Sequence, residues 1–310
     1  NGPDFQNLHR GKESLTLNLK SSKGIKIFQT LVQDADVVIE NFRPQVKYKL
    51  GLDYETLCAL NPAIILASIS GFGQEGPYKD RPGFDQVAQG MSGLMSITGE
   101  PGAGPMRVGI PLADLSAGLF AAQGILLALY ERMSSGKGQW VQTSLLQSQI
   151  FMLDFQAARY AMNGEIPEQA GNNHPTSIPT GVFKTKDGFI NIAASGEVIW
   201  QKLSIALGHA EWIVAPEFST AQARSQNRSK LGDKINECTQ TKTTSHWIDI
   251  LNDKGVPCGP IYSIDEMFAD PQIRHLQISQ PVTNSLSKEI SVLSQPLSLS
   301  RTPSKLDKAA

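Results

Sequence analysis

The residues best suited to bind a ligand lie in a glycine-rich loop that follows an apolar segment. Ile64–Leu66 is typical of a buried strand, and residues 71–83 then contain four glycines and two prolines. Glycine is used where the backbone turns sharply or approaches a ligand closely. In Rossmann-type folds, ligands bind at loops of this kind, directly after a strand. The sequence therefore predicts a ligand site at this loop.

Several sequence blocks, spread over nearly the whole chain, resemble one family. They are E-N-F-R-P at 40–44, L-G-L-D-Y-E-T-L at 50–57, R-V-G-I-P-L-A-D-L at 107–115, G-K-G-Q at 136–139 and A-D-P-Q-I-R at 269–274. In order and spacing they resemble the family III coenzyme A transferases, a superfamily with formyl-CoA transferase, carnitine CoA-transferase and the α-methylacyl-CoA racemases. The resemblance implies transfer of coenzyme A between an acyl-CoA thioester and a carboxylic acid. It implies coenzyme A as a substrate and no permanently bound cofactor.

Coenzyme A carries phosphates, which need cations, and an adenine ring, which needs an apolar slot. By resemblance, Asn41 and Phe42 contact the nucleotide, and Lys49 stands where relatives place a phosphate-binding arginine. Arg43 and Arg81 are further candidate cations for the same region. We expect these five residues to bind coenzyme A.

Each of these assignments has a plainer alternative. Phe42 follows an apolar segment and can equally be a core residue. Lys47 and Lys49 alternate with Tyr48, a pattern that is also typical of a solvated face. Arg107 fits a structural ion pair better than a ligand contact.

The resemblance also implies covalent catalysis by an aspartate, whose carboxylate attacks the acyl-CoA carbonyl. The family places this aspartate directly after G-x-G-Q-x-V-x-x-S-L-x. The corresponding segment here is G-K-G-Q-W-V-Q-T-S-L-L-Q, which puts Gln147 at the catalytic position. A neutral amide is a poor nucleophile, although it can donate and accept hydrogen bonds. An active transferase and a catalytically impaired CoA-binding homologue therefore both stay open.

Two further aspartates have candidate roles. Asp85 stands where relatives also carry an acidic residue, so we assign it a catalytic role, either ordering the loop or binding the pantetheine arm. Asp85 is also expected to cap the helix that begins at Gln86, and Asp114 to cap the helix that follows it.

Two residues further along are weaker candidates. Asp154 lies two helical turns beyond Gln147, so it shares a face but sits about 10 Å away along the axis. A local cap or a pair with Arg159 is the expected role of Asp154. His174 stands between an asparagine and a proline in a turn, which is more typical of a structural residue than of a general base.

Two other activities are disfavoured. Racemases of the family supply a histidine and an aspartate at positions that are Phe84 and Gln142 here, and neither side chain can exchange a proton at neutral pH. G-F-G-Q-E-G at 71–76 matches a dinucleotide-binding spacing, but Pro77 follows it and no acidic residue stands near position 96.

Hydrophobic patterns predict the elements that hold these residues. Strands are expected at 14–19, 37–39 and 63–68, and helices at 22–33 and 54–60. This alternation predicts a parallel sheet with helical crossovers. Later in the chain, a hairpin is expected around Asp187-Gly188, helices over 198–254 and strands over 280–302.

The expected architecture is α/β. Residues 1–165 are assigned to a large Rossmann-like CoA-binding domain, 166–265 to a small α+β domain with its linkers, and 266–310 to a segment that returns to the large domain. The family resemblance further implies that two such chains interlock as a homodimer. By the same resemblance the chain starts after a first strand–helix unit, so a fragment or a shortened member is expected.

Composition restricts the partners. The 28 basic and 29 acidic residues give a net charge of −1, so no overall charge favours nucleic acid or an anionic membrane. The apolar run 118–130 is too short to cross a bilayer and is expected to form a buried core helix. The first residues lack the basic and apolar regions of a signal peptide. Three cysteines without a C-x-x-C pair, and histidines away from zinc-ligand spacings, favour a cytoplasmic protein without a metal.

Overall fold

A parallel β-sheet organises the first half of the chain. The computed structural model describes residues 2–283 and 288–304. The strands of this sheet, in spatial order, are β1 (Val37–Glu40), β2 (Ile65–Ser70) and β3 (Trp140–Ser144). Both pairings are parallel, with Leu66 opposite Trp140. β2 is buried along nearly its whole length, as expected of a strand covered on both faces. The predicted mixed α/β class with a parallel sheet is confirmed.

Helices surround this sheet, and local capping sets their ends. Ser21 and Asp53 cap α2 and α4 by accepting backbone N–H bonds three residues on. Gly136 ends α7 in the left-handed conformation, with a φ of 70°. The helices of this half are α1 (Pro3–Leu8), α2 (Ser22–Asp34), α3 (Pro44–Leu50), α4 (Tyr54–Leu60), α5 (Asp85–Met91), α6 (Leu94–Ile97), α7 (Leu112–Ser135), α8 (Leu145–Phe151) and α9 (Phe155–Asn163).

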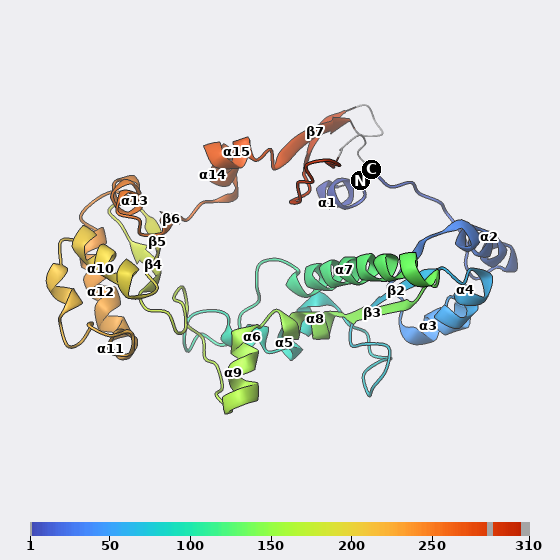
Figure 1. Cartoon of the computed structure of the whole chain (residues 1–310), viewed down its shortest axis with the longest axis horizontal. Helices are drawn as coiled ribbons and strands as arrows, with labels where there is room; N and C mark the ends of the chain where they lie inside the picture. The colour runs from blue at the N-terminus through green and yellow to red at the C-terminus, as the bar shows by residue number, and fades with distance from the viewer. Residues whose placement is uncertain (1, 284–287, 305–310) are drawn as a thin grey trace.

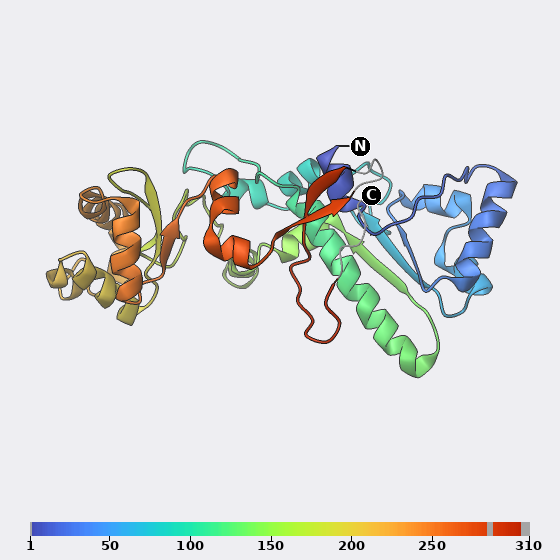
Figure 2. The same ribbon diagram turned by 90° about the horizontal axis from the view of Figure 1, so that it is seen from above.

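The long helix α7 is buried on one side only, which corrects the expectation of a core helix over 118–130. It connects β2 with β3 and packs along both strands (Figure 2). Small residues of this helix, such as Ala117 and Ala121, are buried. Its other face is apolar and exposed, with Leu119 70% and Tyr130 76% exposed. By length and composition alone, α7 is the one helix among the described residues that could cross a membrane, a test that core helices also pass.

The strand expected over 14–19 does not form. Residues 13–18 have no regular secondary structure, and no described strand pairs with them. An alternating pattern gives a strand only where a neighbouring strand completes the backbone hydrogen bonds. The segment instead runs over the surface into α2.

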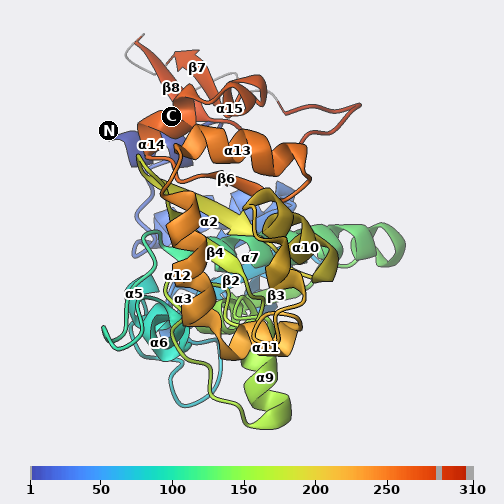
Figure 3. The same ribbon diagram turned by 90° about the vertical axis from the view of Figure 1, so that its left-hand side faces the viewer.

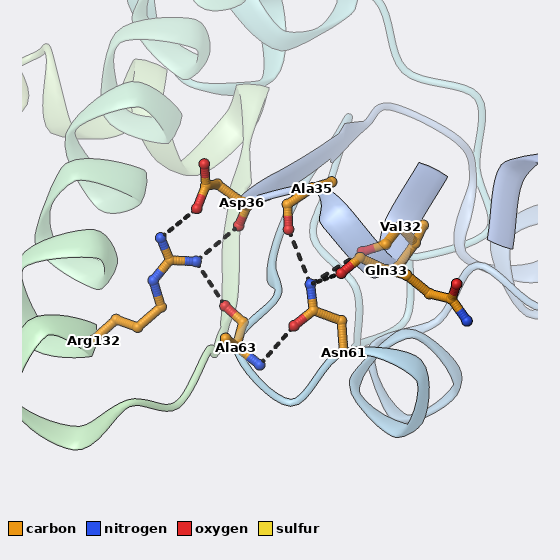
Figure 4. A network of polar contacts seen from close by, with 7 residues as sticks. All are labelled: Val32, Gln33, Ala35, Asp36, Asn61, Ala63 and Arg132. Carbon is orange, nitrogen blue, oxygen red and sulfur yellow. Dashed lines mark hydrogen bonds and ion pairs between the residues drawn. The ribbon is translucent and has the colours of Figure 1, made fainter. Parts of the chain in front are cut away.

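The amino-terminal edge of the sheet is tied together by side chains from distant segments (Figure 4). Arg132, near the end of α7, donates to the carboxylate of Asp36 and to the carbonyl oxygen of Ala63. Asn61 donates to the carbonyl oxygens of Val32 and Ala35. These bonds join α2, α4 and α7 at the edge opposite to the glycine-rich loop.

The second part of the chain builds a separate core on an antiparallel sheet (Figure 3). The predicted hairpin around Asp187-Gly188 is confirmed, and its second strand also pairs with a later one. Trp200, Phe218 and Ile190 are fully buried in this core. Its elements are β4 (Thr180–Lys184), β5 (Phe189–Ala193), α10 (Glu197–Ala206), the 3₁₀ helix η1 (Ala210–Ile213), α11 (Ala221–Gln226), α12 (Arg228–Thr239), α13 (Thr244–Asp253) and β6 (Cys258–Pro260).

The last described elements are α14 (Ile264–Ala269), α15 (Pro271–His275), β7 (Ser279–Thr283) and β8 (Glu289–Leu293). The antiparallel pair of β7 and β8 lies beside the first helix, which β8 contacts (Figure 1). The backbone N–H of Leu293 donates to the side chain of Asn7 over 3.2 Å. Strands expected over 280–302 are thus found on both sides of residues 284–287, which lie outside the described part, and no strand follows Leu293 up to residue 304.

Candidate functional site

The glycine-rich loop is closed at its base by two glycines that touch. A Cβ atom on Gly71 would lie 2.7 Å from the Cα of Gly83, so neither position leaves room for a side chain. Gly71 directly follows β2, and Gly83 stands two residues before α5. The loop between them therefore returns to its starting point at the carboxyl end of the sheet.

A cavity of about 750 Å³ opens beside these glycines, within the size range of small-molecule sites. We call it the edge cavity, because it lies at the carboxyl ends of β1, β2 and β3. Its walls come from the loop after β1, the end of β2, the glycine-rich loop, and the first turns of α7 and α8. The lining residues are Asn41, Phe42, Arg43, Val46, Ile69, Ser70, Gly71, Pro82, Gly83, Phe84, Asp114, Gly118 and Leu145.

A second cavity of about 1170 Å³ adjoins the first. Phe42 and Val46 line both cavities, so the two share a wall. We call the second one the lysine cavity, because Lys20, Lys26 and Lys49 line it. Its other walls are residues 17–22, the exposed side of α2 and the end of α3.

The structure brings four of the five residues expected to bind coenzyme A to these cavities. Asn41, Phe42 and Arg43 line the edge cavity, and Lys49 lines the lysine cavity. Arg81 lines neither, because its guanidinium stacks 3.7 Å from the centre of the Tyr78 ring.

Sequence reasoning missed Lys20 and Lys26. Lys20 stands directly before the Ser21 cap of α2, and Lys26 lies in the second turn of that helix. The available signal was a pair of lysines at the start of the helix expected over 22–33, but no sequence motif linked them to a ligand.

Lys47 is fully buried, which corrects its interpretation as part of a solvated face. Its ammonium donates to Gln74 Oε1 over 2.7 Å and to Ser68 Oγ over 3.2 Å, and it lies 3.4 Å from Glu40 Oε1. The ring of Trp140 lies 4.2 Å away. Burial lowers the pKa of Lys47, and the charge of Glu40 offsets part of that shift.

This buried cluster holds the walls of the edge cavity. Glu40 also accepts a hydrogen bond of 2.7 Å from the backbone N–H of Phe42 through its Oε2 atom. Gln74 belongs to the glycine-rich loop, and Lys47 belongs to α3. The ion pair and the Lys47–Gln74 hydrogen bond together therefore connect the end of β1 and the loop after it with the loop after β2.

The Asp85 side chain is buried, both of its carboxylate oxygens accept hydrogen bonds, and it does not line the edge cavity. It is the first residue of α5, whose N-cap position is occupied by Phe84, and this corrects the expected capping role. Its carboxylate accepts from Ala113 N–H in the first turn of α7, from Gln89 and from Arg107. The expected structural ion pair of Arg107 is confirmed at 3.1 Å.

Gln147 lies at the start of α8, directly after β3. Its backbone N–H donates to Ser144 Oγ, and its side-chain oxygen accepts from the same hydroxyl over 3.1 Å. Ser144 is the N-cap of α8. The Gln147 side chain is exposed at the carboxyl edge of the sheet.

Asp114 lies in the first turn of α7 and lines the edge cavity. The expected capping role is wrong, because Pro111 occupies the N-cap position and no side-chain cap bond forms there. Among the described residues, no donor or cation is bonded to the Asp114 carboxylate. Partial burial, together with the nearby charge of Asp85, raises the pKa of Asp114.

The two weaker candidates have structural positions. Asp154 precedes α9 with a φ of 49° and makes no side-chain cap bond, while Arg159 pairs with Glu165 instead of Asp154. His174 stacks on Phe155, with 5.6 Å between ring centres. Its Nδ1 atom accepts the backbone N–H of Ser177, as the structural interpretation predicted.

Comparison with known proteins places this geometry in a family. Residues 2–310 match the family described as CoA-transferase family III. The chain is 38% identical to succinate–glutarate CoA-transferase of Agrobacterium fabrum, over 95% of this chain and 74% of that protein. It is 36% identical to succinyl-CoA–D-citramalate CoA-transferase of Chloroflexus aurantiacus, over 97% and 75% of the two proteins. A 37% identity to acetyl-CoA:oxalate CoA-transferase of Acetobacter aceti covers 86% and 69%.

Solved structures agree with this assignment. A CAIB/BAIF family protein from Brucella suis superimposes with a TM-score of 0.85 at 36% identity, over 99% of this chain and 80% of that one. The Rv3272 protein from M. tuberculosis gives a TM-score of 0.88 at 26% identity, over 98% and 82% of the two chains. The chain belongs to CoA-transferase family III, and its relatives carry the names of transferases rather than racemases.

Proposed function

We propose that this protein transfers coenzyme A from an acyl-CoA thioester to a carboxylic acid. The observation that carries the proposal is the pair of adjoining cavities at the carboxyl edge of the parallel sheet. One is lined by three lysines and the other by the glycine-rich loop and the first turns of α7 and α8.

The lysine cavity suits the nucleotide end of coenzyme A. Lys20, Lys26 and Lys49 supply cations for its phosphates, and Ile25 and Phe42 supply apolar surface for the adenine. The pantetheine arm then passes Phe42 and Val46, which line both cavities. This route delivers the thioester to the edge cavity.

The acids are proposed to be dicarboxylic acids. Succinate, glutarate, citramalate and oxalate, which occur in the names of the relatives, all carry two carboxylates. Arg43 is the cation that lines the edge cavity, and a guanidinium pairs well with a free carboxylate. We assign Arg43 to the carboxylate that does not react.

A radiolabel exchange assay tests the activity. Succinyl-CoA is incubated with labelled glutarate, oxalate, mesaconate or acetate, and labelled CoA thioester is measured. Transfer to the dicarboxylic acids and little to acetate is expected. Absence of transfer to any acid, despite CoA binding by calorimetry, would refute the proposed activity.

Two variants separate the cavities. Lys49→Ala should weaken CoA binding by about ten-fold, which corresponds to about 1.4 kcal/mol. The matched control is Lys137→Ala, an exposed lysine at the opposite edge of the sheet that lines neither cavity. Arg43→Gln should raise KM for the dicarboxylic acid and leave the Kd of free CoA unchanged. A loss of CoA affinity instead would assign Arg43 to the nucleotide.

Gln147 favours a second candidate function, a CoA-binding homologue without turnover. The amide at the family's catalytic position cannot form the acyl intermediate. In that case Gln147→Asp should create transfer activity that the unchanged protein lacks. We do not propose racemisation, because Phe84 and Gln142 supply no acid or base.

We also propose the assembly and location. A large domain over 1–165, a small domain over 166–265 and a return segment over 266–310 would let two chains interlock as a homodimer. The exposed apolar face of α7, including Leu119, Leu126 and Tyr130, gives such a partner a surface to cover. Light scattering that finds a monomer would contradict this. Three free thiols favour a cytoplasmic location.

A further inference from the structure

The topology brings Asp114 to the place where the family's reaction occurs. α7 is the crossover between the parallel strands β2 and β3, so it starts at their carboxyl edge. α8 follows β3 and starts at the same edge. Asp114 is in the first turn of α7, and Gln147 is in the first turn of α8.

Packing places these two turns against each other. Ala113 and Ala117 form one buried cluster with Leu145, so α7 contacts α8 on both sides of Asp114. Asp114 and Leu145 line the same cavity, and Leu145 stands two residues before Gln147. A thioester carbonyl in the edge cavity is therefore within reach of both first turns.

Asp114 is the acidic residue among those that line the edge cavity. The carboxylate of Asp85, the other acidic residue of the region, already accepts hydrogen bonds from Ala113, Gln89 and Arg107. The Asp114 carboxylate is bonded to none of the described residues and is open to a ligand. A carboxylate without a counter-ion keeps its electron pairs for attack on a carbonyl carbon.

We propose that Asp114 is the nucleophile of this chain and replaces the carboxylate that Gln147 lacks. The inference rests on the proposed transferase function. An Asp114 oxygen attacks the thioester carbonyl of the donor, a C–O bond forms, the C–S bond breaks, and CoA leaves as a thiolate. The product is a mixed anhydride of Asp114 and the donor acyl group.

The cycle closes without a net change in protons or oxidation state. The CoA thiolate attacks the Asp114 carbonyl carbon, and the donor leaves as a free carboxylate. The acceptor carboxylate then attacks the Asp114 thioester, which releases the thiolate and forms a second anhydride. The thiolate finally attacks the acceptor carbonyl, forms the new thioester and frees the Asp114 carboxylate.

Trapping tests the nucleophile directly. The full chain is incubated with succinyl-CoA, treated with borohydride or hydroxylamine, digested and analysed by mass spectrometry. A thioester on Asp114 is reduced to the alcohol by borohydride or converted to the hydroxamate by hydroxylamine. The modified peptide should contain Asp114. A modification on any other residue overturns the inference and leaves the transferase function standing.

Variants give an independent readout. Asp114→Asn should lower turnover with succinyl-CoA and glutarate by about 10⁴-fold while CoA still binds. Asp249→Asn, an exposed aspartate on α13, is the matched control and should keep full activity. Restoring the carboxylate at the family's position, in Asp114→Asn/Gln147→Asp, should recover turnover and shows that the fold is intact.

The outcomes distinguish the two proposals. Turnover of Asp114→Asn within ten-fold of the unchanged protein overturns the role of Asp114 but not the transferase function. No turnover and no adduct in the unchanged protein, with activity appearing in Gln147→Asp, overturns both and identifies the chain as a silent homologue.

Discussion

Replacing Lys47 by methionine should destabilise the protein strongly. The side chain of Lys47 is 0% exposed and that of Glu40 is 3% exposed, so the substitution leaves a buried carboxylate without its cation. Removal of one partner of a buried pair costs about 3–5 kcal/mol. The hydrogen bond to Gln74 is lost as well, which leaves a polar oxygen unpaired. We expect the free energy of unfolding to fall by about 4 kcal/mol, within that range.

Urea unfolding followed by fluorescence measures this change. Lys49→Met is the matched control, because Lys49 lies on the same helix and is exposed, and it should change stability by less than about 0.5 kcal/mol. The double variant Glu40→Gln/Lys47→Met should recover more than half of the loss. A neutral amide needs no counter-charge, and its oxygen can still accept the N–H of Phe42.

Two results would refute this reasoning. A loss below about 1 kcal/mol for Lys47→Met would mean that the pair behaves like one on the surface. A double variant as unstable as the single one would mean that packing, and not the unpaired charge, sets the cost. Folded Lys47→Met should also bind CoA more weakly than Lys49→Met, which loses only the contact of Lys49 with CoA. The reason is that both loops at the edge cavity are bonded through Lys47.

Three further changes have defined outcomes. Gly138→Ala should lower stability by about 3 kcal/mol in urea, because its Cβ would clash with the Ile64 carbonyl, whereas Gly232→Ala, with open space around it, should be neutral or stabilising. Gly83→Ala should weaken CoA binding in calorimetry by at least about ten-fold, that is 1.4 kcal/mol, while Gly109→Ala should not. Asp114→Asn should be more stable than the unchanged protein at pH 7. The raised pKa of Asp114 means that its ionised form is disfavoured on folding, and this penalty exists above the folded pKa and vanishes as the pH falls below the ordinary value of 3.8. Equal urea midpoints of the two proteins at pH 7 would contradict this last expectation.

Local signals in the sequence predicted much of the fold. The helix at 54–60 has its structural bounds because Asp53 caps it and Asn61-Pro62 ends it. The hairpin around Asp187-Gly188 follows from turn chemistry. Asn41 and Phe42 line the cavity because the end of a parallel strand leads to the site.

The misplaced residues depend on contacts between distant segments. Lys47 meets Ser68 and Gln74, which stand 21 and 27 residues away, and no local pattern reports such a partner. Asp114 resembles a helix cap in sequence, but the helix starts at Leu112 after Pro111. Residues 14–19 alternate between apolar and polar side chains as a strand does, but no described strand pairs with them.

The contact between Gly71 and Gly83 also separates the base of the glycine-rich loop, which forms the cavity floor, from the outer part of the loop. Since the chain is pinched shut at its base, the outer residues beyond Gln74 can vary in sequence or length with little effect on the cavity floor. The excursion over 75–81, which lines neither cavity, is therefore a suitable place to insert other sequences, as long as the two glycines and the Lys47–Gln74 hydrogen bond are retained.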